Sequence, residues 1–136
     1  MSENTPEFFN RLIWHDSKLL SFRIIRKNDV DEVVLEVELR GISENELTAM
    51  TVTLEDAVFF LSDIDLQGKR ECADDISSAR CETKTDLMAK LQNGRLKYSP
   101  EALAGYFHFS IYLIPPGGNL DIVAGGFRLA AQKSTS

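Results

Sequence analysis

The chain has few of the residues that cross-link, ligate metals or catalyse: two cysteines and two histidines in 136 residues. Cys72 and Cys81 lie nine positions apart, without the Cys-x-x-Cys spacing typical of a zinc site. In a secreted protein the two could form a disulfide, but without an export signal the reducing cytosol predicts two free thiols. No nucleophile elbow or phosphate loop is present, and the sequence indicates no cofactor.

Long hydrophobic runs are also lacking, because none approaches the roughly 18–20 residues needed to cross a bilayer. The first residues include Glu3 and Glu7 instead of a basic region followed by an apolar stretch, so no signal peptide is expected. The composition, 43% apolar and 26% charged, is typical of a folded globular protein. We therefore expect one cytoplasmic domain over residues 1–136, with a frayed tail at 1–5 and an irregular connection at 67–83.

Positive charge is scarce, and the net charge is −6. The acidic excess lies in residues 1–68, which carry fourteen acidic and six basic side chains. This balance disfavours nucleic-acid binding, since Arg95-Leu96-Lys97 is too short to form a basic patch. Two interpretations stay open: an acidic surface that attracts a basic protein partner, or ordinary charge that keeps the protein soluble.

What the sequence does contain is β-strand alternation. Over residues 106–113, apolar side chains alternate with a polar and aromatic set, Tyr106, His108, Ser110 and Tyr112. A turn at 115–119 precedes a second alternating run that begins at Leu120. The inward positions change parity at Gly125-Gly126, which predicts a β-bulge there.

A second hairpin is predicted over residues 19–40, where outward Arg23 faces Glu36 or Glu38. Strands are also expected at 47–54 and 58–66, with a bend near Ser62. The expected shared core has seven members: Phe22, Ile24, Leu35, Val37, Phe109, Ile111 and Leu113.

Two helices are predicted beside these strands. A short one lies within residues 6–13, and a second starts with a capping pattern at Thr83–Asp86 and ends at Asn93-Gly94. The narrow apolar stripe of the second helix predicts that it lies on a sheet surface. The fold class is therefore α+β and predominantly antiparallel β, a single curved sheet or flattened half-barrel of 6–7 strands with one covering helix.

The run His15-Asp16-Ser17 contains the residue types of a serine triad, but its geometry opposes one. In an extended chain, His15 and Ser17 are about 6.5 Å apart, beyond hydrogen-bond range. We favour local capping by Asp16 and Ser17. His15 and His108 with a carboxylate could form a zinc site, although no spacing brings the two together. A calcium-loop pattern starting at Asp63 lacks its bidentate glutamate.

Three segments together resemble a known group of proteins: Trp14–Leu19, Val52–Val58 and Leu120–Phe127. The chain resembles small, mostly β bacterial proteins that include predicted immunity proteins of contact-dependent toxin systems. The resemblance implies a binding or inhibitory role and no catalytic residue. It does not extend to the segment with Cys72 and Cys81.

Two functional hypotheses follow. The first is a non-enzymatic cytoplasmic interaction protein, toxin-neutralising as the resemblance implies, with no nucleic-acid or membrane partner. The second is a small-ligand-binding or enzymatic β-barrel-like domain with a pocket near His108. The residues expected to contact a partner or ligand are Tyr106, His108, Tyr112, His15, Glu36 and Glu38.

Overall fold

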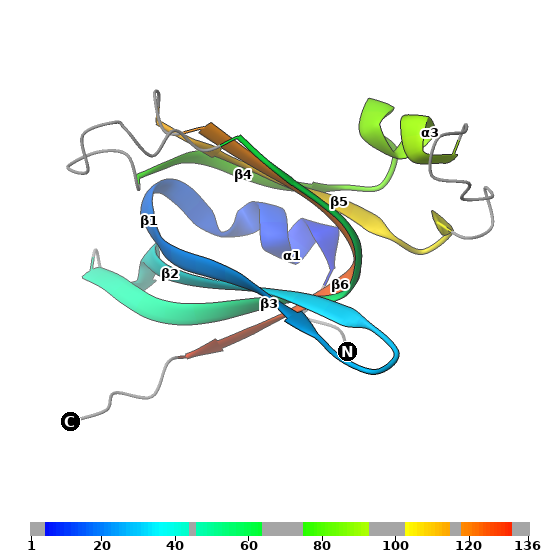
Figure 1. The fold of residues 1–136 in the computed structure, drawn as a ribbon. Coiled ribbons are helices and arrows are strands. Elements are labelled where there is room, and N and C mark those ends of the chain that lie inside the picture. Colours follow the sequence, from blue (N-terminus) through cyan, green and yellow to red (C-terminus); the bar gives the residue numbers. More distant parts are fainter. Residues whose placement is uncertain (1–4, 44–45, 64–74, 93–102, 115–117, 132–136) are drawn as a thin grey trace.

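The computed structural model describes residues 5–43, 46–63, 75–92, 103–114 and 118–131 (Figure 1). Six strands form one antiparallel sheet in the order β1-β2-β3-β6-β5-β4, so the predominantly β half-barrel is confirmed. The elements in chain order are α1 (Pro6–Arg11), β1 (Ile13–Arg26), β2 (Asp31–Ser43), β3 (Glu46–Ser62), β4 (Ile76–Glu82), α3 (Asp86–Gln92), β5 (Phe107–Leu113) and β6 (Gly118–Ala131).

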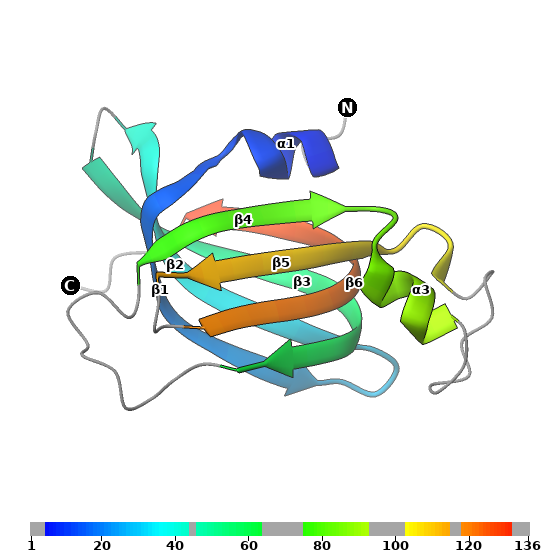
Figure 2. The same cartoon turned by 90° about the horizontal axis from the view of Figure 1, so that it is seen from above.

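The sheet curls until its two edge strands meet at one place. Lys18 of β1 forms an isolated antiparallel bridge with Asp75, directly before β4. The Lys18 Nζ lies 2.8 Å from the Asp75 Oδ1, which adds an ion pair to the backbone contact. Figure 2 shows β1 crossing the end of the sheet to reach β4. The curl creates a concave face, where the main core lies, and a convex face.

Helix α1 fills the concave face. It lies between two layers of the curled sheet, one with β4 and β5 and the other with β1 and β2, while β3 and β6 bend from one layer into the other (Figure 1). Phe9 is fully buried, and its ring centroid lies 4.7 Å from that of Trp14 and 5.2 Å from those of Phe109 and Phe127. Thr5 begins the helix by accepting the Phe8 N–H at 3.1 Å. This residue of the predicted tail is therefore a helix cap.

Helix α3 lies on the convex face, as its narrow apolar stripe predicts. Met88 and Leu91 pack with Leu103 against Val123 of β6 in a second, smaller core. The Thr85 hydroxyl caps the helix by accepting the Met88 N–H at 3.2 Å. The predicted stop at Asn93-Gly94 lies outside the described residues. Among the described residues, no helix is long and apolar enough to cross a membrane.

The predicted break between two strands at 55–57 is wrong, because β3 runs continuously through it. Asp56 adopts a left-handed backbone with φ of 53°, and the pairing register with β6 shifts between Ala57 and Phe59. The bulge therefore precedes the predicted site at Ser62. The parity change in β6 is confirmed, since Ala124 and Phe127 are both buried, but the extra residue is on β3.

The predicted irregular connection at 67–83 is wrong over its last part, which forms β4. The inward side chains of β4 include the small residues Ala79 and Cys81, and α1 packs against this strand. A register shift between Ile76 and Ser78 also interrupts the alternation. Small inward residues and a broken period both weaken the sequence signal of a strand. Residues 67–74 lie outside the described part of the chain.

Five of the seven predicted core residues are buried together, and two are not. Leu35, Val37, Phe109, Ile111 and Leu113 belong to the main core, whereas Phe22 and Ile24 are exposed. These two pair with Leu35 and Val33 and so point toward the concave side. The tip of the β1–β2 hairpin lies away from α1 in both views, so this helix does not cover them (Figures 1 and 2).

We expect Phe109→Ala to lower the free energy of unfolding by about 3–5 kcal/mol, because truncation of a fully buried ring leaves a cavity. Chemical denaturation monitored by circular dichroism measures this loss. Leu61→Ala is the matched control at an exposed apolar position, with an expected change within about 0.5 kcal/mol. Equal unfolding midpoints for Phe109→Ala and the wild type would contradict the packing described.

Candidate binding surface

His108, the central residue of the predicted aromatic row, is buried beneath the start of α3. Its Nδ1 lies 2.8 Å from the Thr85 hydroxyl, and its Nε2 lies 2.8 Å from the Asp121 carboxylate on β6. The Thr85 oxygen already accepts the Met88 N–H, so its own proton is available to His108 Nδ1. The Nε2–H then donates to Asp121. We call this chain of three side chains the α3 latch.

The α3 latch contains the carboxylate, imidazole and hydroxyl of a catalytic triad, but its contacts hold α3 on the sheet. A triad nucleophile must be open to substrate and activated by its base. Here the Thr85 oxygen caps a helix, and both nitrogens of the buried imidazole are occupied. The latch therefore ties α3 to β5 and β6.

The other two members of the row have different surroundings. The Tyr106 hydroxyl donates to the Asp56 carboxylate, and its ring packs against the smaller core under α3. Tyr112, at the far end of β5, is exposed. Tyr106, His108 and Tyr112 thus do not form one open surface, because α3 covers part of the row.

The charged residues of the β1–β2 hairpin are largely paired with one another. Arg23 Nη1 lies 3.0 Å from Glu36 Oε2, which confirms the predicted cross-strand contact and selects Glu36 over Glu38. Glu38 is partly buried, opposite Lys18 in the strand register. Because Arg23 neutralises Glu36, the convex face is less negative here than the sequence alone indicates.

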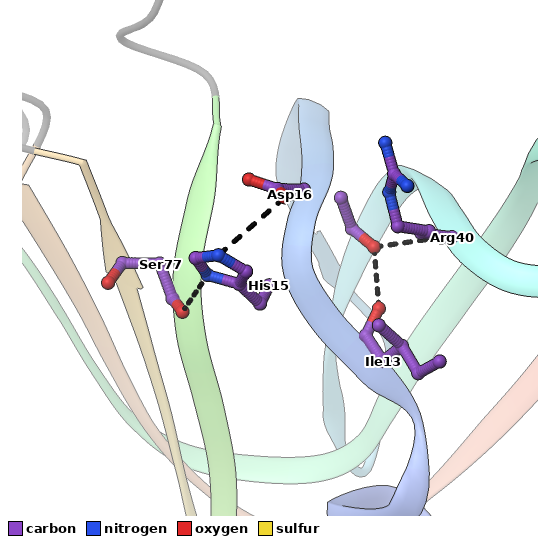
Figure 3. A network of polar contacts seen from close by, with 6 residues as sticks. Ile13, His15, Asp16, Arg40 and Ser77 are labelled. Carbon is purple, nitrogen blue, oxygen red and sulfur yellow. Dashed lines mark hydrogen bonds and ion pairs between the residues drawn. The ribbon is translucent and has the colours of Figure 1, made fainter. Parts of the chain in front are cut away.

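His15, Asp16 and Ser17 lie where β1 approaches β4, and their contacts are structural (Figure 3). The register between β1 and β2 slips between Ile13 and Lys18, and Ser17 bridges the slip. Its hydroxyl donates to the Ile13 carbonyl at 2.7 Å and accepts the Arg40 N–H at 2.9 Å. Ser17 therefore binds backbone groups, but the N–H that it accepts belongs to Arg40 on β2 and not to a local residue as predicted, and Asp16 contacts His15 instead.

His15 contacts β4 from this segment. Its Nδ1 lies 3.3 Å from the Ser77 carbonyl oxygen, and its Nε2 lies 3.6 Å from the Asp16 carboxylate (Figure 3). The side chain is largely exposed. Within the described residues, no group of three or more His, Cys, Asp and Glu side chains is placed to hold a metal ion.

The free edge of β4 is covered by side chains from the N-terminal segment. The Asn10 side chain donates to the Cys81 carbonyl at 3.0 Å and accepts the Cys81 N–H at 2.8 Å. This pair of bonds reproduces what a neighbouring strand provides. His15 and Lys18 contact the same strand edge farther along. Most of β4 is therefore protected against pairing with another chain.

The edge of β1 is different. Beyond the bridge at Lys18, no described strand pairs with β1 on the side away from β2. One extra residue, Leu20, interrupts the register, and residues 20–26 then run along the margin of the sheet. Leu20, Phe22 and Ile24 are 48%, 37% and 47% exposed. We call residues 20–26 the open edge.

A groove adjoins the open edge on its concave side, with a volume of about 540 Å³. It lies between the tip of the β1–β2 hairpin and the second half of β3. Phe22 and Phe60 lie beside each other across the two strands, with ring centroids 5.6 Å apart. The groove is lined by Ile24, Val33, Ala57, Val58, Phe59, Phe60, Asp56 and the hairpin residues 26–31.

The sequence alone did not reveal the open edge as a candidate site. The alternation of Phe22 and Ile24 predicts burial, and this prediction depends on a covering element that the described residues do not supply. Comparisons of the chain with protein-family models, curated proteins and solved structures found no match. What the chain does must therefore be inferred from its own geometry.

We expect Thr85→Ala to lower the free energy of unfolding by about 2–3 kcal/mol, because it removes a helix cap and leaves buried His108 Nδ1 without its donor. Thr85→Ser keeps the hydroxyl and should lose less than half of this. Thr83→Ala, at an exposed position, is the control. Urea unfolding compares the variants, and equal losses for Thr85→Ala and Thr85→Ser would contradict the latch.

Cys81 is a free, buried thiol, which agrees with the predicted reduced state, whereas Cys72 lies outside the described residues. Burial, with smaller contributions from the charges of Glu7 and Glu82, raises the pKa of Cys81 to about 12. At pH 8 the Cys81 thiol is therefore almost entirely protonated and weakly reactive.

In a Cys72→Ser variant, we expect Cys81 to resist a thiol reagent at pH 8 while the protein is folded and to react fully in denaturant. Absorbance from the released chromophore measures both states. A native rate equal to that of a small model thiol would show that Cys81 is accessible.

Proposed function

We propose that this protein is a non-enzymatic binding protein that recognises another protein through the open edge. The observation that carries the proposal is the contrast between the two margins of one sheet. Side chains of Asn10, His15 and Lys18 cover the edge of β4, whereas no described residue pairs with the open edge of β1. Proteins commonly block exposed edges, because such edges template pairing with other chains.

The side chains of the open edge support this role. Burial of a Leu, Ile or Phe side chain contributes about 1.5–3 kcal/mol relative to full exposure. Leu20, Phe22 and Ile24 are each partly exposed, so a partner that covers them gains a fraction of that value at each position. Added backbone hydrogen bonds along residues 20–26 would fix the register of the complex.

A toxin-neutralising role is the form of this function that the sequence resemblance implies. An inhibitor of this kind needs a stable surface and no turnover. The contacts of His15, Ser17, Thr85 and His108 agree with that requirement, since each serves the fold. Cytoplasmic location belongs to the same proposal.

A ligand pocket near His108 is the second candidate function. A groove of about 440 Å³ lies beside the start of α3, and its described lining includes Thr85, Met88, Leu103 and Tyr106. His108 is not among those lining residues, and its ring nitrogens are occupied by the α3 latch. A metabolite retained by the purified protein and identified by native mass spectrometry would favour this candidate.

Single lysine substitutions at the open edge test the binding role. We expect Leu20→Lys and Ile24→Lys each to weaken capture of the partner from the source organism by about 2 kcal/mol or more, as loss of an apolar anchor does. Leu61→Lys is the control, because Leu61 is similarly exposed but points to the opposite face of β3 from the groove residue Phe60. Quantitative mass spectrometry measures the captured protein for each variant.

Hydrogen exchange then locates the interface on the folded protein. The captured partner should protect amides within residues 20–26. Undiminished capture by both lysine variants would rule out the open edge. Loss of capture by Tyr112→Ala, with full capture by the edge variants, would instead assign binding to the exposed end of β5.

A further inference from the structure

We infer that the open edge accepts an acidic, alternately apolar β-strand from another protein, and that it does not pair with a second copy of this chain. The inference rests on the proposed function and specifies the partner segment. It is carried by the charge and shape of residues 20–27, which differ from those of the rest of the protein.

The open edge is a basic strip on an acidic protein. The net charge of the chain is −6, yet residues 17–28 contain Lys18, Arg23, Arg26 and Lys27 and no acidic residue. Lys18 pairs with Asp75 at the bridge, and the other three cations follow the margin of the sheet where an added strand would lie. Like charges placed opposite one another across strands are destabilising, so a basic strand is disfavoured there.

The ion pairs of the hairpin neutralise these cations in part but leave them on the outer side of the strip. Arg23, Arg26 and Lys27 contact Glu36, Asp31 and Glu32 respectively, and all three acids belong to β2, on the side away from the open edge. In each pair the cation is the more exposed member: 56% against 33%, 79% against 33% and 51% against 12%. An arriving strand therefore meets the cations first and the acids about one strand spacing, roughly 4.8 Å, farther away.

The concave side of the open edge favours a partner strand with apolar residues at alternate positions. Phe22 and Ile24 point toward this side, and the groove of about 540 Å³ continues from them to Ala57 and Phe60. Its lining also includes the charged hairpin residues 26–31 and Asp56. Successive side chains of a strand point to opposite faces. A strand that adds here meets the apolar side chains Phe22 and Ile24 with every second residue, and its remaining residues lie beside Ser21 and Arg23 on the convex face.

A second copy of the chain is a poor partner for the open edge, because its own edge strand is basic. Consider antiparallel pairing of two open edges with the concave sides together, centred on Phe22, Arg23 or Ile24. In every case Arg23 lies directly opposite or diagonal to its own copy. Cross-strand neighbours at these positions are about 4.5–8 Å apart, so the two guanidinium groups repel. This repulsion favours a different partner over self-association.

Three synthetic peptides test the inference by NMR titration of the full-length protein. The first is an acetylated ten-residue peptide that alternates valine and glutamate. The second replaces every glutamate by lysine, and the third is the acidic peptide with a proline at its centre. We expect the acidic peptide to shift the amide signals of residues 20–26 and to bind at least about tenfold more tightly than the other two.

Neutralisation of the basic strip should weaken this binding. The double variant Arg26→Gln, Lys27→Gln is expected to lower the affinity for the acidic peptide by about threefold to tenfold, with a smaller loss at high salt. The double variant Arg80→Gln, Lys84→Gln is the matched control, since Arg80 on β4 and Lys84 after it are exposed and lie outside the open edge. Equal affinities for the double variant and the wild type would overturn the charge argument.

The remaining outcomes separate this inference from the proposed function. Absence of acidic-peptide binding, or equal binding of the basic peptide, overturns the inference, while protection of residues 20–26 by the captured partner would still support the function. A concentration-dependent dimer in sedimentation experiments, with these amides protected, assigns the edge to a second copy. Protection of the same amides in the free monomer shows an edge already occupied and overturns both proposals.

Discussion

The insertion of Phe9 into the curled sheet is the interaction on which the other features depend. Its ring touches Trp14, Phe109 and Phe127, and so joins α1 to both layers of the sheet. The same burial sets Asn10 opposite the Cys81 backbone and leads the chain along β4 toward Lys18. A helix as short as α1 is not stable by itself, so its docking depends on this aromatic packing.

One short helix, α1, covers only part of the concave face of the sheet, and this explains why the two edge strands differ. The N-terminal segment reaches the edge of β4 from residue 10 to residue 18, and there its side chains replace a strand. After the extra residue Leu20, β1 continues past α1 with two inward apolar side chains, Phe22 and Ile24, that the helix does not reach. The α3 latch covers a different region, the convex face beside His108.

Local alternation was sufficient to predict most of the sheet. The run at 106–113, the turn-linked strand after it and the contact between Arg23 and Glu36 all follow from a period of two. Strand β4 was missed because Ala79 and Cys81 are small where α1 packs. The burial of His108 and the exposure of Phe22 depend on where helices dock, and this long-range information is absent from a short pattern. The basic run between residues 17 and 28 was the available signal for the open edge.

The distance along the chain between Phe9 and its ring partners has a consequence for biosynthesis. Phe109 and Phe127 are synthesised about 100 residues or more after Phe9. Strands β3 and β6 are likewise far apart in the sequence, so the central pairing must also wait. Folding dominated by such non-local contacts is slow. The nascent chain therefore carries unprotected phenylalanines until these later strands emerge, and a chaperone that binds short aromatic segments has its target at residues 8–14 during that time.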